Sequence, residues 1–341
     1  MSTVKPTAAD LARQAQRCLD TFDLPLALKF YERALEAEPD DPELLDATGE
    51  LLLRLGEPDR ARRALQRSAS VGPRRNPVTY LLLAQASGGA QAVAYYREGI
   101  SVLGEREAKM RAEIKKARDG DARAAREAEL EGLLQTTCSA LCAIAEVYMT
   151  DLCDEEDAES QCETCVGRAV SLSAGYPWGD LEPQQSLANL RLSQCRESDA
   201  RAALDRVVAA VDAASADEDG PLEGLLTVEF RTTTAKLLLE VGRPEEAADI
   251  LEDLLVESED APELRFLAAL GAARLGDPAA AEGHLAWFRE KRARPDHDPE
   301  LDEWDPSFAQ VVEELQEAAA KGGSISGAYG SGQGANEMET D

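Results

Sequence analysis

The sequence predicts an all-α protein, a solenoid of about seven helix pairs with a C-terminal capping helix. Three observations lead to this prediction. A short phrase recurs three times along the chain, and a helical packing pattern recurs with a period of 34 residues. Of all residues, 44% are apolar but only 5% are aromatic, so the core must be built from Leu, Ala and Val. Internal repeats of this length are the usual signature of stacked repeat architectures.

The recurring phrase reads LGEPDRA at 55–61, VGRPEEA at 241–247 and LGDPAAA at 275–281. In each copy the glycine suits the position just after a helix, where a left-handed backbone is common. The proline two residues later suits the first position of the next helix, where its missing N–H costs nothing. Each copy therefore predicts a corner between two helices.

The helix after each corner carries a small residue, a large apolar residue four positions later, and a small or apolar residue three positions after that. This spacing places all three on one helical face. The sets are Ala27, Tyr31, Ala34; Ala61, Leu65, Ser68; Ala92, Tyr96, Gly99; Ala158, Cys162, Cys165; Ala200, Leu204, Val207; Ala247, Leu251, Leu254; and Ala281, Leu285, Phe288. The A-x3-F-x2-A-x4-P pattern and the 34-residue period resemble the tetratricopeptide repeat, which implies a superhelix of helix pairs.

The first helix of each repeat is also recognisable. Pro42 and Pro262 are expected to begin such helices, and Gly49 stands where the first helix needs a small residue against its partner. The expected parts are an N-terminal extension (1–7), repeats one to three (8–104), a charged helical insert (105–131), repeats four to seven (132–294), a connector and capping helix (295–321), and a disordered Gly/Ser-rich tail (322–341).

The insert interrupts the period with eight basic residues, eight acidic residues and almost no large apolar ones. We expect one or two solvent-exposed helices, hinged at Gly120. The insert is either a plain surface insertion or an additional contact with a partner.

Charge is the strongest compositional feature: 66 acidic against 36 basic residues give a net charge of −30. Such a chain repels nucleic acid and anionic membranes and attracts basic proteins. We therefore expect a basic protein partner, no direct contact with nucleic acid and none with membranes. No apolar stretch approaches the length of a membrane span, and the N-terminus lacks a signal-peptide pattern.

Five of the seven cysteines lie between 138 and 165, and the last two form a C-x-x-C. On the repeat pattern, Cys162 and Cys165 occupy packing positions, where a free cysteine behaves as a small hydrophobe. The alternative is a metal or redox site, which would need further ligands; the only histidines, His284 and His297, lie more than 100 residues away. No nucleotide-binding or hydrolase motif is present, so we expect no enzyme, no cofactor and no metal.

A more specific resemblance lies in the middle of the chain. The segments AEVYMTDLC (145–153), EDAESQCETC (156–165) and QQSLANLRLSQ (184–194) resemble the dedicated assembly chaperones of the large-subunit ribosomal protein L-four. The resemblance implies capture of the new ribosomal protein by its basic internal loop, then escort from cytoplasm to nucleus for assembly of the large subunit. Contact with nuclear import factors would run through the client. The resemblance carries no catalytic residues.

A −30 superhelix could hold such a loop along an acidic concave groove between repeats two and six, lined by the first helices of the repeats. The candidate client-binding residues are Glu43, Asp46 and Glu50 in repeat two, Thr150 and Asp151 in repeat four, and Glu229, Lys236 and Glu240 in repeat six. The alternative is a generic tetratricopeptide adaptor or co-chaperone for another peptide client. A clamp for acidic peptides would need Lys, Arg and Asn in the groove, whereas this set is mainly acidic.

Overall fold

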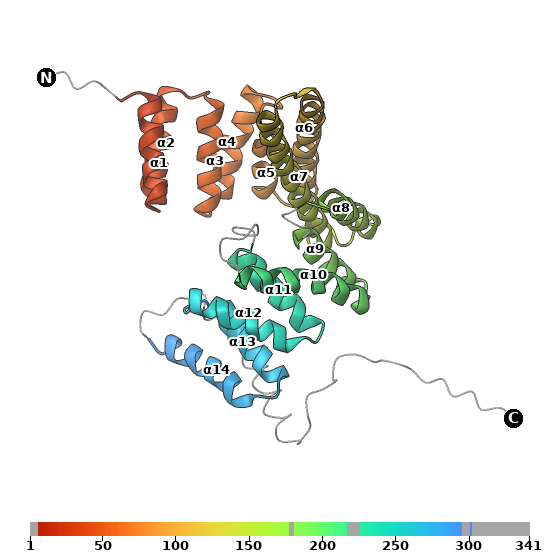
Figure 1. Cartoon of the computed structure of the whole chain (residues 1–341). Helices are drawn as coiled ribbons and strands as arrows, with labels where there is room; N and C mark the ends of the chain where they lie inside the picture. The colour runs from red at the N-terminus through yellow and green to blue at the C-terminus, as the bar shows by residue number, and fades with distance from the viewer. Residues whose placement is uncertain (1–5, 177–180, 217–225, 295–300, 302–341) are drawn as a thin grey trace. The chain divides into compact units, whose positions relative to one another are not determined.

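The computed structural model describes residues 6–176, 181–216, 226–294 and 301. Every regular element in these ranges is an α-helix (Figure 1), so the predicted fold class is confirmed. The helices are α1 (Ala8–Asp20), α2 (Leu24–Ala37), α3 (Pro42–Arg54), α4 (Pro58–Val71), α5 (Pro77–Gln85), α6 (Gly89–Lys116), α7 (Gly120–Met149), α8 (Ala158–Ser173), α9 (Leu181–Ser193), α10 (Glu197–Ala216), α11 (Val228–Glu240), α12 (Pro244–Glu257), α13 (Pro262–Arg274) and α14 (Pro278–Arg292). The predicted capping helix, connector and tail lie outside the described residues, apart from Leu301.

The predicted corners form as the recurring phrase requires. Gly56, Gly242 and Gly276 have φ angles of 73°, 71° and 76°, in the left-handed region that glycine adopts without a steric cost. In each corner the residue after the glycine donates its N–H to the carbonyl five residues earlier, over 2.8 to 2.9 Å. This bond closes the helix end in a Schellman motif. The next helix begins at the proline in all three copies, as predicted.

The seven packing sets on the second helices are buried throughout, which confirms the repeat pattern. Their small first residues are between 0% and 7% exposed, and the large residues four positions on are between 0% and 8% exposed. Gly49 on α3 faces one of them closely: a Cβ at Gly49 would lie 2.5 Å from Cγ of Leu65 on α4. The predicted need for a small residue there is confirmed.

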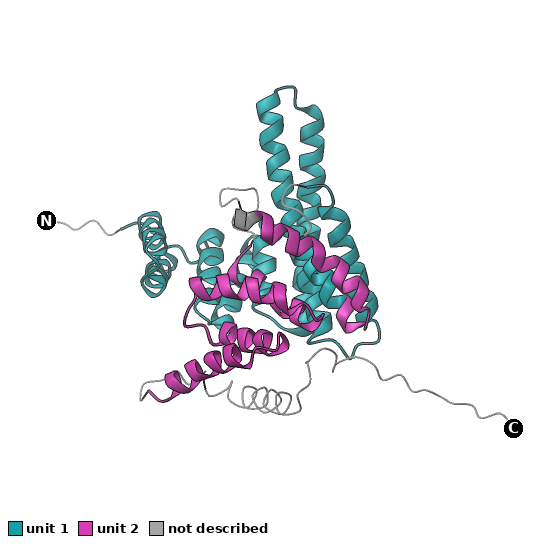
Figure 2. Ribbon diagram, turned by 60° about the horizontal axis from the view of Figure 1, so that its bottom comes forward, with its two compact units in different colours: residues 1–190 teal, residues 191–341 magenta. Residues whose placement is uncertain are grey.

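The chain divides into two compact units, residues 1–190 and 191–341 (Figure 2). Within unit 1, consecutive helices from α1 to α8 pack against one another, and α3 also touches α5, the first helix of the next repeat. Within unit 2, α11, α12, α13 and α14 pack in the same order, and α11 also touches α13. Contact between first helices of neighbouring repeats is what stacks helix pairs into a continuous core.

The charged insert forms two exposed helical segments that are continuous with the helices of repeats three and four. The segment 105–131 prolongs α6 and α7, which reach 28 and 30 residues and turn at 117–119, so that Gly120 is the first residue of α7. The sequence there is rich in Ala, Glu, Lys and Arg and contains no proline, so nothing ends either helix earlier. We call residues 104–129, none of which is buried, the arm.

Candidate functional site

Asp46 on α3, one of the predicted client-binding residues, is not an open acceptor in this structure. Its carboxylate is nearly buried, with 12% of the side chain exposed. Oδ1 accepts hydrogen bonds from the hydroxyls of Ser68 (2.6 Å) and Thr79 (2.8 Å). Oδ2 accepts hydrogen bonds from Arg75 (2.7 Å) and Asn76 (3.1 Å). These donors come from α4, the following loop and α5, so Asp46 joins repeat two to repeat three.

Glu43 and Glu50, the other two predicted residues on α3, remain accessible. The Glu43 side chain is 84% exposed, and its carboxylate lies 3.8 Å from Arg75. Glu50 is exposed and lies near Tyr31. Burial of Tyr31 raises the pKa of its phenol, and the Glu50 carboxylate adds a smaller contribution in the same direction. These two carboxylates can meet a basic partner without breaking the core.

Thr150 and Asp151 end the first helix of repeat four, and both have structural roles. The Thr150 hydroxyl donates to the carbonyl of Glu146 within α7. Oδ2 of Asp151 accepts the backbone N–H of Gly89 over 2.7 Å, at the start of α6. The residue before that helix, Gly88, has no side chain to cap it, so Asp151 supplies the missing acceptor from 62 residues away.

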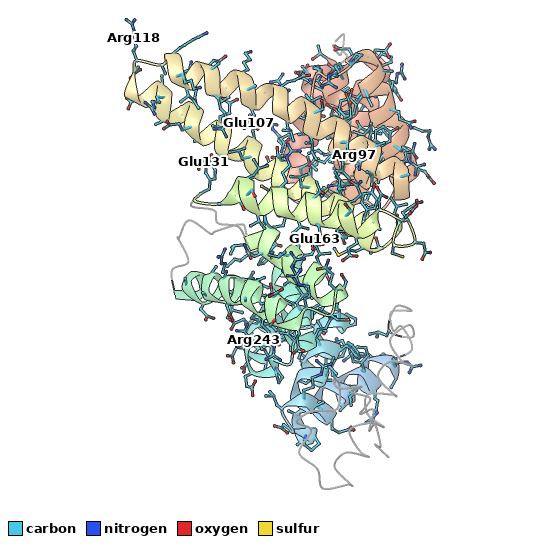
Figure 3. The ribbon with its side chains drawn as sticks, turned by 90° about the vertical axis from the view of Figure 1, so that its right-hand side faces the viewer. Arg97, Glu107, Arg118, Glu131, Glu163 and Arg243 are labelled. Atoms are coloured by element: carbon cyan, nitrogen blue, oxygen red, sulfur yellow. The ribbon has the colours of Figure 1, made fainter. Side chains whose placement is uncertain are left out.

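The remainder of the Y-M-T-D-L-C phrase holds the same corner together. Tyr148 is buried in the core between α6, α7 and α8, and Leu152 packs against that core. Arg97 on α6, labelled in Figure 3, reaches the Tyr148 hydroxyl (3.3 Å) and the side-chain oxygen of Gln161 on α8 (3.0 Å). Our sequence reasoning did not identify Arg97, because its partners lie 51 and 64 residues further along the chain.

In unit 2, the three predicted residues lie on α11. Glu229 and Glu240 are exposed, near the start and at the end of the helix. Lys236 forms an ion pair with Glu263 of α13 over 2.5 Å, and both side chains are almost half exposed. An exposed pair of this kind contributes little to stability, so its charges remain available to a partner.

The cysteine stretch packs into the core of unit 1. Cys138, Cys142, Cys162 and Cys165 are between 1% and 8% exposed, which confirms the packing assignment of the C-x-x-C. Burial raises the pKa of Cys138 to about 12 and that of Cys162 to about 11, which keeps both thiols protonated at neutral pH. Among the residues that the structure describes, no three His, Cys, Asp or Glu side chains are placed to share a metal ion.

Sequence reasoning also missed a second, partly buried carboxyl. Glu182 on α9 receives a hydrogen bond from the Ser139 hydroxyl on α7. Burial raises the pKa of Glu182, and the hydrogen bond from Ser139, which acts in the opposite direction, offsets only part of this rise. No pattern in the sequence separates Glu182 from the many surface acids, because its burial depends on packing against a helix some 40 residues earlier.

These surfaces offer exposed acids on a helical frame. None of the described helices has the length and apolar character to cross a membrane.

Comparison with known proteins gives consistent matches. A family model described as tetratricopeptide repeat matches residues 30–63. The chain is 29% identical over 247 residues to a protein named "Probable assembly chaperone of rpl4" from Schizosaccharomyces pombe, covering 71% of this chain and 66% of that protein. It is 28% identical over 275 residues to a protein of the same name from Emericella nidulans, covering 75% of this chain and 62% of that protein. The matches thus span just under two thirds of the length of these relatives.

Among solved structures, one named assembly chaperone of RpL4 (Acl4) superposes with a TM-score of 0.64 and 28% identity, covering 81% of this chain and 99% of that one. A structure of the APC/C hetero-tetramer Cut9–Hcn1 superposes with a TM-score of 0.50 at 12% identity, covering 92% of this chain and 53% of that one, and supports the fold alone. The resemblance to the assembly chaperones that the sequence suggested is confirmed by these similarities.

Proposed function

We propose that this tetratricopeptide-repeat chain, a relative of the assembly chaperones of rpl4, binds a newly made ribosomal protein of the L-four type and protects it until assembly. The observation that carries the proposal is the similarity to two proteins and one solved structure with that name, over 71% to 81% of this chain. Such a role is one of binding, not of catalysis.

The charge of the chain suits a client whose internal loop is rich in Arg and Lys. Unit 1 has 32 acidic and 22 basic residues, and unit 2 has 34 acidic and 14 basic residues. Carboxylates can stand in for the rRNA phosphates that such a loop would otherwise seek. Long-range attraction of this kind speeds encounter, while shielding the loop prevents contacts with the wrong nucleic acid.

We assign the client contacts to four exposed acids on the first helices of repeats two and six, Glu43, Glu50, Glu229 and Glu240. The concave groove remains our hypothesis for where the loop lies. Lys236 stays in the predicted set, whereas Asp46, Thr150 and Asp151 leave it because their side chains already bond within the repeat framework. We further propose that the complex travels from cytoplasm to nucleus, with import factors reading the client.

The test is a titration of the isolated L-four loop against the full chain and two variants of equal charge. The first carries Glu43→Lys, Glu50→Lys, Glu229→Lys and Glu240→Lys. The control reverses four exposed acids on or beside the second helices α2 and α12, namely Glu36, Glu38, Asp249 and Glu252.

We expect the first variant to weaken client binding at least about tenfold more than the control, because contact charges act on dissociation as well as encounter. Equal weakening would show that net charge alone acts and would refute the assigned contacts. No binding by the unaltered chain would refute the proposed function.

A further inference from the structure

The arm (residues 104–129) extends well beyond the core of unit 1. The last buried residue of α6 is Leu103 and the first of α7 is Leu130. At 1.5 Å of rise per residue, the 13 residues from Leu103 to Lys116 extend about 20 Å. Figure 3 shows Arg118 at the far end of this hairpin, with Glu107 and Glu131 nearer its base.

The base of the arm is fixed to the loop between α4 and α5. Arg74 forms ion pairs with Glu98 and with Glu105, the second over 2.7 Å. Arg106 donates to the carbonyl of Arg75 over 2.6 Å. These contacts tie the first residues of the arm to this loop.

The end of the arm is basic, although the chain as a whole is acidic. Residues 109–118 contain five basic residues and one acid. Lys109, Lys115, Lys116 and Arg118 are all exposed, and none forms an ion pair within the described part of the chain. The nearby acid Glu113 is engaged by Arg126 over 3.5 Å. We call these four exposed cations the basic tip.

A purely structural role explains only part of the basic tip. Lys115 and Lys116 lie in the last turn of α6, where cations complement the helix dipole. Lys109 lies about two turns earlier, and Arg118 lies past the end of the helix, so the dipole accounts for neither. An open hollow of about 230 Å³ beside them is lined by Lys116, Arg118 and Arg126 and also by the acids Glu113 and Asp119.

The acidic core of the chain does not cancel the field of the tip. Charges are screened over about 8 Å at physiological salt, so acids near the base act only weakly on Arg118, about 20 Å away. Asp119 and Asp121 are exposed beside Arg118, and the Asp119 carboxylate accepts the backbone N–H of Asp121 at the start of α7. The expectation that this chain avoids nucleic acid came from its net charge. A net charge sums over the whole chain and does not show a local excess of cations at the end of the arm. Locally, an anionic partner would be attracted.

The chemistry of the arm favours phosphate groups over an acidic protein. The core of a protein interface is usually apolar or aromatic and depleted in Lys. No large apolar side chain between 104 and 129 is exposed; Met110 and Ile114 are half-buried. Binding to a phosphate backbone needs only Lys and Arg, which are what the tip provides.

We propose that the basic tip binds the phosphate backbone of RNA. The choice of RNA among polyphosphates rests on the proposed function, because a ribosomal protein is handed over where ribosomal RNA is present. The tip would then bring the chaperone to RNA while the acidic surfaces still hold the client. The proposal reverses, for the basic tip alone, our sequence-based expectation of no direct contact with nucleic acid. For the rest of the described surface that expectation stays in place.

The test measures binding of a fluorescein-labelled 20-base-pair RNA duplex to the full chain by anisotropy, at 100 and 300 mM salt. If the four tip cations each meet a phosphate, affinity should fall by about 50-fold between these salt concentrations. The variant with Lys109→Glu, Lys115→Glu, Lys116→Glu and Arg118→Glu should bind at least about tenfold more weakly than the unaltered chain at 100 mM salt.

The matched control reverses four exposed cations that also form no described ion pair, at Arg17, Lys29, Arg33 and Arg63 on α1, α2 and α4. Both variants change the net charge from −30 to −38. We expect the control to keep most of the RNA affinity. No RNA binding by the unaltered chain, or equal loss in both variants, would overturn the proposal.

A labelled 20-residue polyglutamate peptide is the second probe. If it binds the basic tip more tightly than RNA does at the same salt, the tip is a protein-docking site and the proposal is wrong. Titration of the tip variant with the client loop separates this proposal from the proposed function. Client binding should not be weakened, since no tip residue belongs to the assigned client contacts and the added negative charge can only strengthen attraction of the basic loop.

Discussion

The junction around Asp46 and the arm are both rich in charge, yet they use charge in opposite ways. At the junction, one nearly buried carboxylate accepts four hydrogen bonds from side chains of repeats two and three. In the arm, four cations stand exposed without ion pairs in the described structure. The comparison teaches that the kind of residue does not decide its role in a repeat protein. Burial and the number of partners decide it.

The largest expected effect comes from removing the carboxylate at the junction. Asp46→Ala leaves the hydroxyls of Ser68 and Thr79 without their acceptor, and should lower the free energy of unfolding by about 2–4 kcal/mol. Urea unfolding followed by circular dichroism measures this. Glu43→Ala, on the same helix but exposed, is the control and should change stability by less than about 0.5 kcal/mol. Similar losses in both variants would show that the network does not stabilise the junction.

Two glycines sharpen the same contrast between packed and exposed regions. Gly49→Ala should destabilise the chain by about 1–3 kcal/mol, because the new methyl group would overlap Leu65 in the core. Gly104→Ala, where the arm begins, meets no atom within 4 Å and should stabilise the chain by about 0.5–1 kcal/mol through better helix propensity. Thermal unfolding of the two variants should therefore shift in opposite directions. A shift in the same direction would contradict the packing difference.

The smallest effect concerns Glu182, a partly buried carboxyl with fewer hydrogen-bond donors than Asp46. Burial raises its folded-state pKa above the unfolded value, so the folded state binds the proton more tightly. Its contribution is most favourable at low pH, and stability is lost as pH rises from the unfolded pKa through the raised one. Glu182→Gln should therefore be more stable than the unaltered chain at pH 7, with the difference shrinking towards pH 4.5. Unfolding measured at both pH values checks this, and a difference that grows on acidification would disprove the assignment.

The repeat architecture could be predicted because its rules are local. A glycine and a proline two residues apart define a corner, and three positions on one helical face define the packing surface. Two further corners escaped prediction because the left-handed position holds Phe22 (φ 58°) or Cys195 (φ 57°) instead of glycine. The geometry is the same, but a signal that depends on glycine cannot find it.

The candidate site was less predictable, because roles there depend on distant partners. Asp46 lies on the same face of α3 as Glu43 and Glu50, and nothing within that helix marks it as buried. Its partners Arg75, Asn76 and Thr79 follow 29 to 33 residues later, in the next repeat. The exposed acids Glu43, Glu50, Glu229 and Glu240 remain candidate client contacts. The titration with the L-four loop tests this hypothesis.

The way the arm joins the stack affects how this protein could vary between species or be engineered. The chain leaves the core after Leu103 and rejoins it at Leu130. The two helices of the arm run side by side, as the Glu113–Arg126 ion pair shows. Lengthening or shortening both helices by equal turns would therefore leave the spacing between repeats three and four unchanged. Since no residue of the arm is buried, its tip is a natural place for insertions, deletions or a grafted module. The repeats can stay fixed by packing while the arm changes length freely.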